Sequence, residues 1–239
     1  MSNYLTNYLN KRMEEKLSAH IPSRKPAGPV ITISRETGCG GLKISRELAA
    51  ELNKSCYSKP WLVISKEVLS ESAQELKMDP EKVKRLMKLD QHFTFEEILS
   101  AFSDKYYKSN RAIMKTVRGV IRNFAMDGCS IILGRGGHII AGDLKNSLHV
   151  RLIAPLEWRT ESLTVRKGCT KEEAMQYIRE TDVRRENLHR YFIKDKTSEE
   201  RYDLTIDVSR FPDGSVACII ARAFESKGVG EKFLDYPES

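Results

Sequence analysis

The sequence predicts an α/β protein built on a parallel five-stranded sheet with helices on both faces. Short apolar, β-branched runs alternate with segments of helical periodicity along most of the 239 residues. Strands that alternate with helices form parallel sheets that are buried on both faces. The first of these runs also ends in three glycines within four positions, where a strand gives way to a helix. A chain of this length can bury a full core, so we expect one main domain.

The chain begins with an amphipathic segment. Residues 3–19 carry tyrosines, leucines and a methionine at helical intervals, which predicts a helical arm that packs on the domain or on a second copy of the chain. The second arrangement would make the protein a homodimer through this helix. The prolines and glycine of "IPSRKPAGP" then indicate a linker. We therefore assign residues 1–28 to an N-terminal arm and linker.

The glycine-rich junction is the most informative stretch. The run "VITIS" (30–34) predicts the first strand, and "LKISRELAAELN" (42–53) predicts the helix after it. A helix N-terminus there offers backbone N–H groups to an anion, and glycines let the backbone approach a phosphate closely. The P-loop pattern fits only partly, because Arg35 stands at its first glycine and Gly41 at its lysine. The dinucleotide pattern fails, since Lys43 stands at its third glycine. A tight turn without a ligand is the alternative on this loop alone.

The rest of the chain continues the alternation of strands and helices. Helical periodicity extends over residues 64–127. Later strands are predicted at "SIILG" (130–134), "SLHVRLIA" (147–154) and "YDLTIDVS" (202–209). Residues 156–190, between the last two of these strands, have a helical pattern and are rich in arginine.

The charge balance and the cysteine pattern limit the partners and metals that the protein is expected to bind. The balance of 40 Lys+Arg against 33 Asp+Glu favours acidic partners, but the positive charges are dispersed without a base-stacking aromatic motif, so no nucleic-acid partner is expected. The five cysteines contain no C-x-x-C pair, and the histidines have no metal-like spacing, so no protein-held metal is predicted. Scattered cysteines, no signal peptide and no stretch of about 18 apolar residues predict a cytoplasmic protein without a membrane partner.

Four motifs occur in an order that resembles the cytidylate kinase-like family, within the P-loop nucleoside monophosphate kinases. They are "SRETGCGG" (34–41), "GRGG" (134–137), "APLEWR" (154–159) and "YDLTIDVSR" (202–210). The resemblance spans roughly residues 29–226 and implies a P-loop kinase-like domain over 29–228, with a C-terminal tail at 229–239. Within this domain, residues 64–127 would form a helical acceptor-side segment and residues 168–200 a lid.

The resemblance also implies a set of functional residues. The residues that would cradle the phosphates of ATP are Gly38, Cys39, Gly40, Gly41, Lys43 and Ser45. The acceptor side would comprise Arg135, which binds the acceptor's phosphate, and Gly136. The catalytic set would comprise Lys43 and four arginines on or near the lid, which are Arg159, Arg184, Arg185 and Arg190. Phosphoryl transfer is mostly positioning and charge neutralisation, so these arginines and Mg²⁺ would converge on the transferred group.

Two of the motifs depart from those of ordinary cytidylate kinases. Gly41 and Leu42 replace the P-loop lysine and the small or hydroxyl residue after it, and we expect Lys43 to substitute in part for that lysine. Gly136 replaces an aspartate that helps to hold cytidine in the family. The first departure concerns rate and metal binding, and the second concerns the choice of base.

These observations predict a nucleoside monophosphate kinase that transfers the γ-phosphoryl group of ATP to a nucleotide, with CMP or dCMP as the first acceptors to consider. The missing lysine motivates an alternative, a nucleotide-binding regulatory protein that has lost turnover. The arginines assigned to the lid also have a purely structural interpretation. Arg184 and Arg185 follow Asp182 and precede Glu186, so this stretch also fits an exposed, ion-paired helix face.

Overall fold

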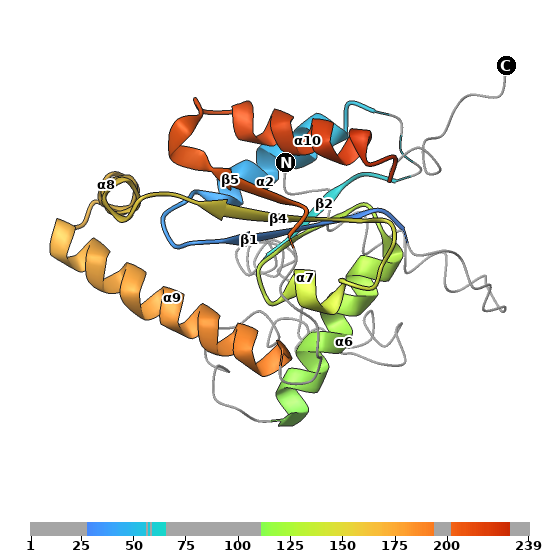
Figure 1. Cartoon of the computed structure of the whole chain (residues 1–239), viewed down its shortest axis with the longest axis horizontal. Coiled ribbons are helices and arrows are strands. Elements are labelled where there is room, and N and C mark those ends of the chain that lie inside the picture. Colours follow the sequence, from blue (N-terminus) through green and yellow to red (C-terminus); the bar gives the residue numbers. More distant parts are fainter. Residues whose placement is uncertain (1–27, 56, 58, 66–110, 194–201, 230–239) are drawn as a thin grey trace, which may run out of the picture.

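The structure, a computed structural model, describes residues 28–55, 57, 59–65, 111–193 and 202–229. The predicted parallel five-stranded sheet is confirmed, with the strand order β2-β3-β1-β4-β5 (Figure 1). The strands are β1 (Val30–Arg35), β2 (Leu62–Ile64), β3 (Ser130–Leu133), β4 (Ser147–Ile153) and β5 (Leu204–Asp207). Because all five run in the same direction, their carboxyl ends lie along one edge of the sheet, where open α/β folds bind ligands.

Helices cover both faces of this sheet (Figure 1). On one face lie α2 (Gly41–Leu52) and α10 (Ser215–Ser226), which pack against each other. On the other face lie α6 (Arg111–Asp127), the single-turn α7 (Gly137–Ile140) and the long α9 (Lys171–Ile193). The remaining helix, α8 (Leu156–Lys167), follows β4 directly at the carboxyl edge, and the short 3-10 helix η2 (Val208–Arg210) follows β5.

The core explains why the central strands carry unbroken apolar runs. Ile31 and Ile33 of β1 are buried against Leu48 of α2, in a cluster that also takes in Trp61 and Phe224. The Trp61 and Phe224 rings meet edge to face with centroids 5.1 Å apart, a favoured aromatic geometry. Burial of about 25 cal/mol per Å² of apolar surface makes this two-sided packing the main stabilising contribution to the sheet.

The sequence pattern did not predict one strand of the sheet, and it predicted one helical segment where the structure has two helices. The three-residue strand β2 lies where helical periodicity was expected to begin, since Ile64 is its last residue. The helix predicted over 156–190 is two helices, α8 and α9. Gly168 ends α8 with a φ of 63°, a left-handed conformation that glycine adopts without steric penalty.

Several predicted segments lie outside the described residues. These are the N-terminal arm and linker through residue 27, residues 66–110 of the acceptor-side segment, residues 194–201 of the lid, and the tail from residue 230. Among the described helices, none combines the length and the apolar composition that crossing a lipid bilayer requires.

Candidate active site

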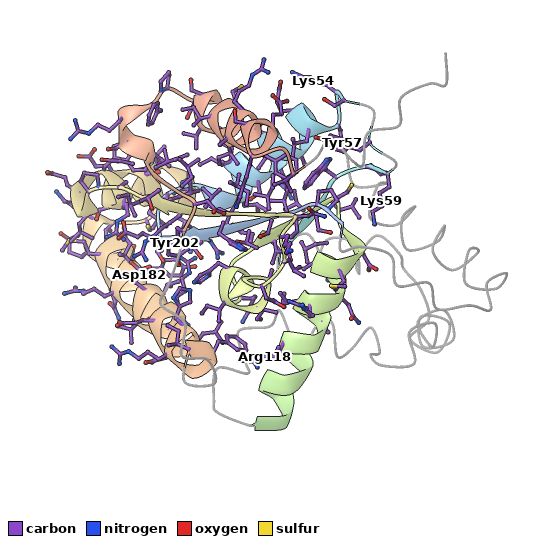
Figure 2. All side chains as sticks on the ribbon, turned by 45° about the vertical axis from the view of Figure 1, so that its right-hand side comes forward. Lys54, Tyr57, Lys59, Arg118, Asp182 and Tyr202 are labelled. Carbon is purple, nitrogen blue, oxygen red and sulfur yellow. The ribbon has the colours of Figure 1, made fainter. Side chains whose placement is uncertain are left out.

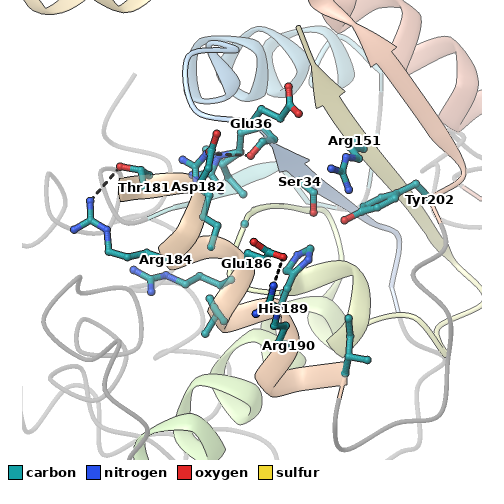
Figure 3. A pocket seen from close by; sticks show the side chains of 18 of the residues that line it. Ser34, Glu36, Arg151, Thr181, Asp182, Arg184, Glu186, His189, Arg190 and Tyr202 are labelled. Atoms are coloured by element: carbon teal, nitrogen blue, oxygen red, sulfur yellow. Dashed lines mark hydrogen bonds and ion pairs between the residues drawn. The ribbon is translucent and has the colours of Figure 1, made fainter. Parts of the chain in front are cut away.

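A cavity of about 540 Å³ opens at the carboxyl edge of the sheet (Figure 3). One wall is α9, which contributes residues from Tyr177 to Ile193. Facing it are the end of β1, the turn after β3, and Arg151 of β4 with Tyr202 next to it. The position is far from the C-terminal end of α2, where Figure 2 labels Lys54, Tyr57 and Lys59. The cavity therefore lies where the fold class predicts a ligand.

The lining of the cavity is strongly basic. Among the residues that the structure describes, six arginines line it, namely Arg35, Arg135, Arg151, Arg184, Arg185 and Arg190. Three carboxylates, those of Glu36, Asp182 and Glu186, also line it. Guanidinium groups present planar forks of donors that match phosphate oxygens. The excess of arginine therefore suits a ligand that carries several negative charges.

The glycine loop joins β1 to α2 beside this cavity. Gly40 occupies the N-cap of α2 with a φ of 69°, and no side chain caps the helix, which leaves N–H groups of its first turn open. A Cβ atom added to Gly38 would come within 2.7 Å of Arg159 Cβ, so only glycine allows this approach of α8. The loop thus combines close backbone packing with a helix N-terminus that no side chain caps, and both features suit an anion cradle.

Two of the residues predicted to bind the cofactor have local structural roles. Ser45 is buried, and its hydroxyl donates to the Gly41 carbonyl oxygen at 2.7 Å. Burial, with a smaller contribution from Glu36, raises the pKa of the Cys39 thiol to about 12. The thiol therefore stays protonated at neutral pH and packs as a small side chain, rather than acting as a reactive thiolate at a helix N-terminus.

Helix α9 docks onto the glycine loop through Asp182. The Asp182 carboxylate accepts hydrogen bonds from the Thr37 backbone N–H at 2.9 Å and from the Thr37 hydroxyl at 2.6 Å. It also pairs with Arg159 Nη1 at 2.9 Å. From the next turn, Arg185 Nη1 donates to the Arg35 carbonyl oxygen at 3.0 Å and to Thr37 Oγ1 at 2.9 Å. The predicted lid therefore lies in direct contact with the predicted cradle.

Arg159 connects three parts of the site. Its Nε donates to the Ala154 carbonyl oxygen at 3.0 Å and its Nη1 to the Thr37 carbonyl oxygen at 3.2 Å. Only 11% of the side chain is exposed. With the Asp182 pair included, Arg159 ties the end of β4 to the loop and to α9. It does not line the cavity, so its place is between the cradle and the lid.

The turn after β3 holds Arg135 in an unusual backbone conformation. Its φ is 56°, between Gly134 and Gly136, which are also left-handed. A non-glycine residue in this region is strained, and strain of this kind clusters at functional sites. A Cβ added to Gly136 would come within 2.7 Å of the Phe192 ring, which is fully buried. Phe192 of α9 therefore occupies the space that an aspartate at position 136 would need.

Lys43 does not reach the cavity. Its ammonium group, in the exposed first turn of α2, donates to Asp213, just before α10, at 2.8 Å and lies 3.9 Å from Glu47. The hydrogen bond to Asp213 raises the pKa of Lys43, so the charge is retained but faces away from the arginine cluster. The structure gives no support to the expectation that Lys43 substitutes for the P-loop lysine.

The remaining lid arginines differ in their settings. Arg184 donates to the Thr181 hydroxyl at 3.1 Å, while Arg190 pairs with Glu186 at 2.6 Å on an exposed part of α9. Both line the cavity. The exposed pair fits the ordinary ion-paired helix face, and pairs of that kind contribute little to stability. Arg185, which is directed at the loop, is the lid arginine most closely joined to the cradle.

Sequence reasoning missed several residues of the site. Arg166 of α8 donates to the Gly38 carbonyl oxygen and to the Ser162 carbonyl oxygen, the latter at 3.0 Å. Arg151 and Tyr202 line the cavity, with the Arg151 guanidinium over the Tyr202 ring at 5.5 Å from its centroid. Both residues belong to segments that the sequence predicts as strands. An arginine within a strand pattern usually indicates a solvent-facing position, so Arg151 gave no signal of a ligand site.

A buried histidine stiffens the wall behind Tyr202. His138 Nδ1 lies 3.2 Å from the Ser34 hydroxyl, and its Nε2 lies 3.1 Å from the Tyr202 hydroxyl. Burial, followed by repulsion from His189 and other cations, lowers the pKa of His138 to about 3. The ring is therefore neutral at physiological pH and positions Ser34 and Tyr202 without carrying charge.

The glycine loop does not form a magnesium site by itself. Leu42 stands where the P-loop pattern has a hydroxyl, and the Ser45 hydroxyl is used within its own helix. Nowhere in the described part of the chain do three or more His, Cys, Asp or Glu side chains gather in a way that could hold a metal ion. These donors do not fit a protein-held Mg²⁺, so we assign no step to the metal.

Comparison with known proteins agrees with this geometry. The model of the cytidylate kinase-like family matches residues 30–210. The chain is 32% identical over 115 residues to the cytidylate kinase of Methanopyrus kandleri, across 44% of this chain and 58% of that protein. It is also 26% identical over 104 residues to a uronate isomerase of Corynebacterium glutamicum, across 43% of this chain and 20% of that enzyme. The chain thus spans less than two thirds of either curated relative.

A solved structure shares the fold. A protein from Eubacterium ventriosum superposes with a TM-score of 0.55 and 22% sequence identity, across 83% of this chain and 98% of that one. At this level of identity the likeness concerns the arrangement of the strands and helices. The family match covers the glycine loop, the turn after β3 and the whole of α8 and α9. Of these segments, the turn after β3, α9 and the residues that lead into the loop line the cavity.

Proposed function

Because the chain belongs to the cytidylate kinase-like family, we propose that it is a phosphotransferase that moves the γ-phosphoryl group of ATP to a nucleotide acceptor, with CMP and dCMP as the first candidates. The observation that supports this proposal most is the arginine-lined cavity beside the glycine loop. Donor phosphates would lie on the loop and the acceptor's phosphate among the arginines. Such a layout matches the needs of phosphoryl transfer, in which positioning and charge neutralisation supply most of the catalysis.

The proposed reaction needs no protein nucleophile. A phosphate oxygen of the acceptor attacks the γ-phosphorus of ATP, and the bond from that phosphorus to the bridging oxygen breaks. The electron pair stays on ADP, which leaves, and a nucleoside diphosphate forms. Arg135 would hold the acceptor's phosphate, while Arg185 and Arg184 approach from α9. Their guanidinium groups stay protonated throughout and stabilise the charge on the transferred group.

The acceptor base is the least determined part of the proposal. Phe192 fills the space next to Gly136, so the family's base-contacting aspartate has no counterpart at that position. A site that lacks a hydrogen-bond partner for the exocyclic amine of cytosine discriminates weakly against uracil. We therefore propose that CMP, dCMP and UMP are phosphorylated at comparable rates.

The test is a coupled assay of ADP formation with ATP and Mg²⁺, against all common nucleoside and deoxynucleoside monophosphates. We expect turnover with the pyrimidine nucleotides and selectivity between CMP and UMP below about tenfold. Strong preference for CMP would assign the reading of the base to another residue. An absence of transfer to every acceptor would contradict the proposed kinase activity.

The second candidate is a nucleotide-binding regulatory protein without turnover. It is favoured by one observation, the absence of any side chain at Gly41, together with the diversion of Lys43 to Asp213. Calorimetry with ATP and with the nucleoside monophosphates distinguishes the two functions, because a regulatory protein binds these ligands and leaves them unchanged. ATP and Mg²⁺ are the proposed cofactors of the kinase.

Two further predictions concern the whole protein. The homodimer through residues 3–19 stays a prediction, and sedimentation equilibrium of the full chain against a chain that begins at residue 28 tests it. The cytoplasmic location likewise stays a prediction, to be checked by fractionation of cells that express the tagged protein.

A further inference from the structure

The glycine loop differs from the P-loop pattern at two positions, one of which gains a basic side chain while the other loses one. Arg35 stands where that pattern has its first glycine, and Gly41 stands where it has the lysine. Each change alone would damage a phosphate site, one by adding bulk to the loop and the other by removing a charge. Their joint occurrence raises the question of whether the arginine takes the place of the lysine in space.

The packing around Gly41 shows which side chain occupies the space that a lysine at position 41 would need. Gly41 is buried, and a Cβ atom built on it would lie 3.2 Å from Arg35 Cγ and 3.4 Å from Arg35 Cδ. The aliphatic part of Arg35 therefore occupies the space into which a side chain at position 41 would begin to extend. Leu133, the third neighbour at 3.2 Å, closes the same space from β3. A lysine at position 41 and an arginine at position 35 cannot both be accommodated there without movement.

The guanidinium end of Arg35 lies at the turn after β3. A Cβ atom on Gly134 would overlap Arg35 Nη1 and come within 3.2 Å of Arg35 Cζ. Glycine at position 134 therefore leaves room for the arginine. Arg35 also lines the cavity together with Arg135. The charge consequently lies between the glycine loop and the residue proposed to hold the acceptor's phosphate.

The backbone that carries Arg35 is fixed from the lid. Arg185 Nη1 donates to the Arg35 carbonyl oxygen at 3.0 Å, and β1 pairs with β4 at Arg35 itself. Arg185 of α9 reaches both the loop and the cavity, whereas two other cations near the loop lie outside the cavity. Lys43 is turned to Asp213, and the exposed Arg166 donates to loop and helix carbonyl oxygens. Arg35 is thus the basic residue of the loop that faces the cavity.

We propose that Arg35 provides, from the other end of the loop, the positive charge that a lysine at position 41 provides in the ordinary P-loop pattern. This inference rests on the proposed kinase function. During transfer, the Arg35 guanidinium donates hydrogen bonds to phosphate oxygens of the donor while the bond between the γ-phosphorus and the bridging oxygen breaks. It stays protonated, so no proton is exchanged with the substrate.

The first variant separates charge from packing. Arg35→Met keeps an unbranched aliphatic chain beside Gly41 and removes the guanidinium. We expect kcat to fall by about a hundredfold, the usual loss when one preorganised donor is removed from a reacting group, while the melting temperature stays within a few degrees. Arg222→Met, on the exposed face of α10 and paired only locally with Glu225, removes the same charge as a matched control and should leave kcat unchanged.

The second experiment restores the lysine. Arg35→Ala empties the space beside Gly41 and should lower kcat like Arg35→Met. Gly41→Lys alone should also be slow, because its side chain meets Arg35 and Leu133. The double variant Arg35→Ala/Gly41→Lys should recover at least tenfold in kcat over Arg35→Ala. Recovery in the double variant together with a loss of kcat in Arg35→Met is not expected if Arg35 only packs against Gly41, because methionine keeps that packing.

ATP affinity, measured by calorimetry for all variants, keeps this test separate from that of the proposed function. If the wild-type protein shows no turnover, the kinase proposal fails, and the role of Arg35 is judged from binding alone. Affinity at least tenfold lower in Arg35→Met and regained in the double variant would support it. Wild-type kcat and ATP affinity in Arg35→Met, or a double variant no better than Arg35→Ala, would overturn it.

Discussion

At the scale of single residues, the direction of the Arg135 side chain depends on an uncommon left-handed backbone conformation. Arg135 is left-handed between two left-handed glycines, and the surrounding turn maintains this strain at a cost on the order of 1–3 kcal/mol. Hydrogen bonds from Gly137 N–H to the Gly134 carbonyl oxygen at 3.0 Å and from Ile140 N–H to the Gly136 carbonyl oxygen at 2.9 Å fix that turn. The strain directs Arg135 into the cavity instead of along the strand.

Arg135→Lys should weaken acceptor use more than it weakens the fold. Lysine keeps the charge but cannot present two parallel donors to a phosphate. We expect a loss of about 2–4 kcal/mol in transition-state stabilisation, measured as a decrease in kcat/KM for the acceptor. The KM for ATP should change little. Arg179→Lys, at an exposed position of α9 outside the cavity, is the control in the same assay. Equal kinetics for both variants would remove Arg135 from the site.

Gly136→Asp should destabilise the protein without conferring preference for cytosine. The new Cβ would meet the buried Phe192 ring at 2.7 Å and would require a φ of 66°. Overpacking together with an unfavourable φ predicts a loss of about 2–4 kcal/mol in the free energy of unfolding. Gly228→Asp is the matched control, because Gly228 has the same φ and no neighbour within 4 Å among the described residues. Urea denaturation of both variants measures the contribution of Phe192 as the difference between them.

At the scale of elements, the contact between the glycine loop and α9 decides how the lid behaves. Asp182 accepts from the loop N–H of Thr37, and the same kind of donor would bind a phosphate. Arg159 and Arg185 both lie within ion-pair distance of this carboxylate, at 2.9 and 3.7 Å. Asp182 therefore joins the lid to Thr37 of the loop and to Arg159 of α8, alongside the direct hydrogen bonds from Arg185 to the loop.

Asp182→Asn should loosen α9 from the loop. The amide keeps one acceptor but loses the attraction to both arginines, and partly buried charged pairs of this type contribute about 1.5–3 kcal/mol. We expect the backbone amides of residues 171–193 to exchange with deuterium at least tenfold faster. Glu180→Gln, where the exposed carboxylate accepts a hydrogen bond from Gln176 of the same helix, should leave exchange unchanged. Unchanged exchange in Asp182→Asn would show that packing and the hydrogen bonds of Arg185 hold the lid without this carboxylate.

The elements that the sequence predicted and those that it missed differ in a physical way. β1, β3 and β4 have four to seven residues, contain β-branched side chains and are followed within three positions by a glycine or a proline, so local signals identify them. β2 is only three residues long, and so short an apolar run fits a helix or a strand equally well. The break at Gly168 was hidden because both flanking segments favour helix.

The same contrast holds within the site. The glycine loop and Arg135 could be predicted because their neighbours along the chain explain them. The direction of Lys43 depends on Asp213 at the start of α10, and the need for glycine at position 136 depends on Phe192 at the end of α9. Such partners are distant in sequence and meet only in the folded protein, so periodicity and spacing do not indicate them.

At the scale of the whole molecule, buried histidines make the fold sensitive to acid. His138 has a pKa of about 3, because burial disfavours the charged ring, and burial also lowers the pKa of His149. In the unfolded chain both return to about 6.5. Between these values the unfolded state binds more protons than the folded state, so stability falls as the pH drops below about 6.5 and keeps falling toward 3.

The free energy of unfolding should therefore decrease by about 2 kcal/mol from His138 alone between pH 7 and pH 5. Urea denaturation at intervals of half a pH unit measures this slope. His138→Gln removes the titrating group while offering polar atoms to Ser34 and Tyr202, so its slope should be shallower than that of the wild type. Parallel curves for the two proteins would show that His138 is not the source of the acid sensitivity.

The central position of β1 also sets the order in which the protein can form during synthesis. Val30 pairs with Ser130 on one side and with Ser147 on the other, so neither neighbour exists when β1 leaves the ribosome. At the usual rates of translation, this apolar strand waits on the order of ten seconds for its partners. Closing such distant pairings makes folding slow. The nascent chain is thus exposed to aggregation at the strand on which the finished sheet is centred, and it is a natural client for chaperones that bind emerging apolar segments.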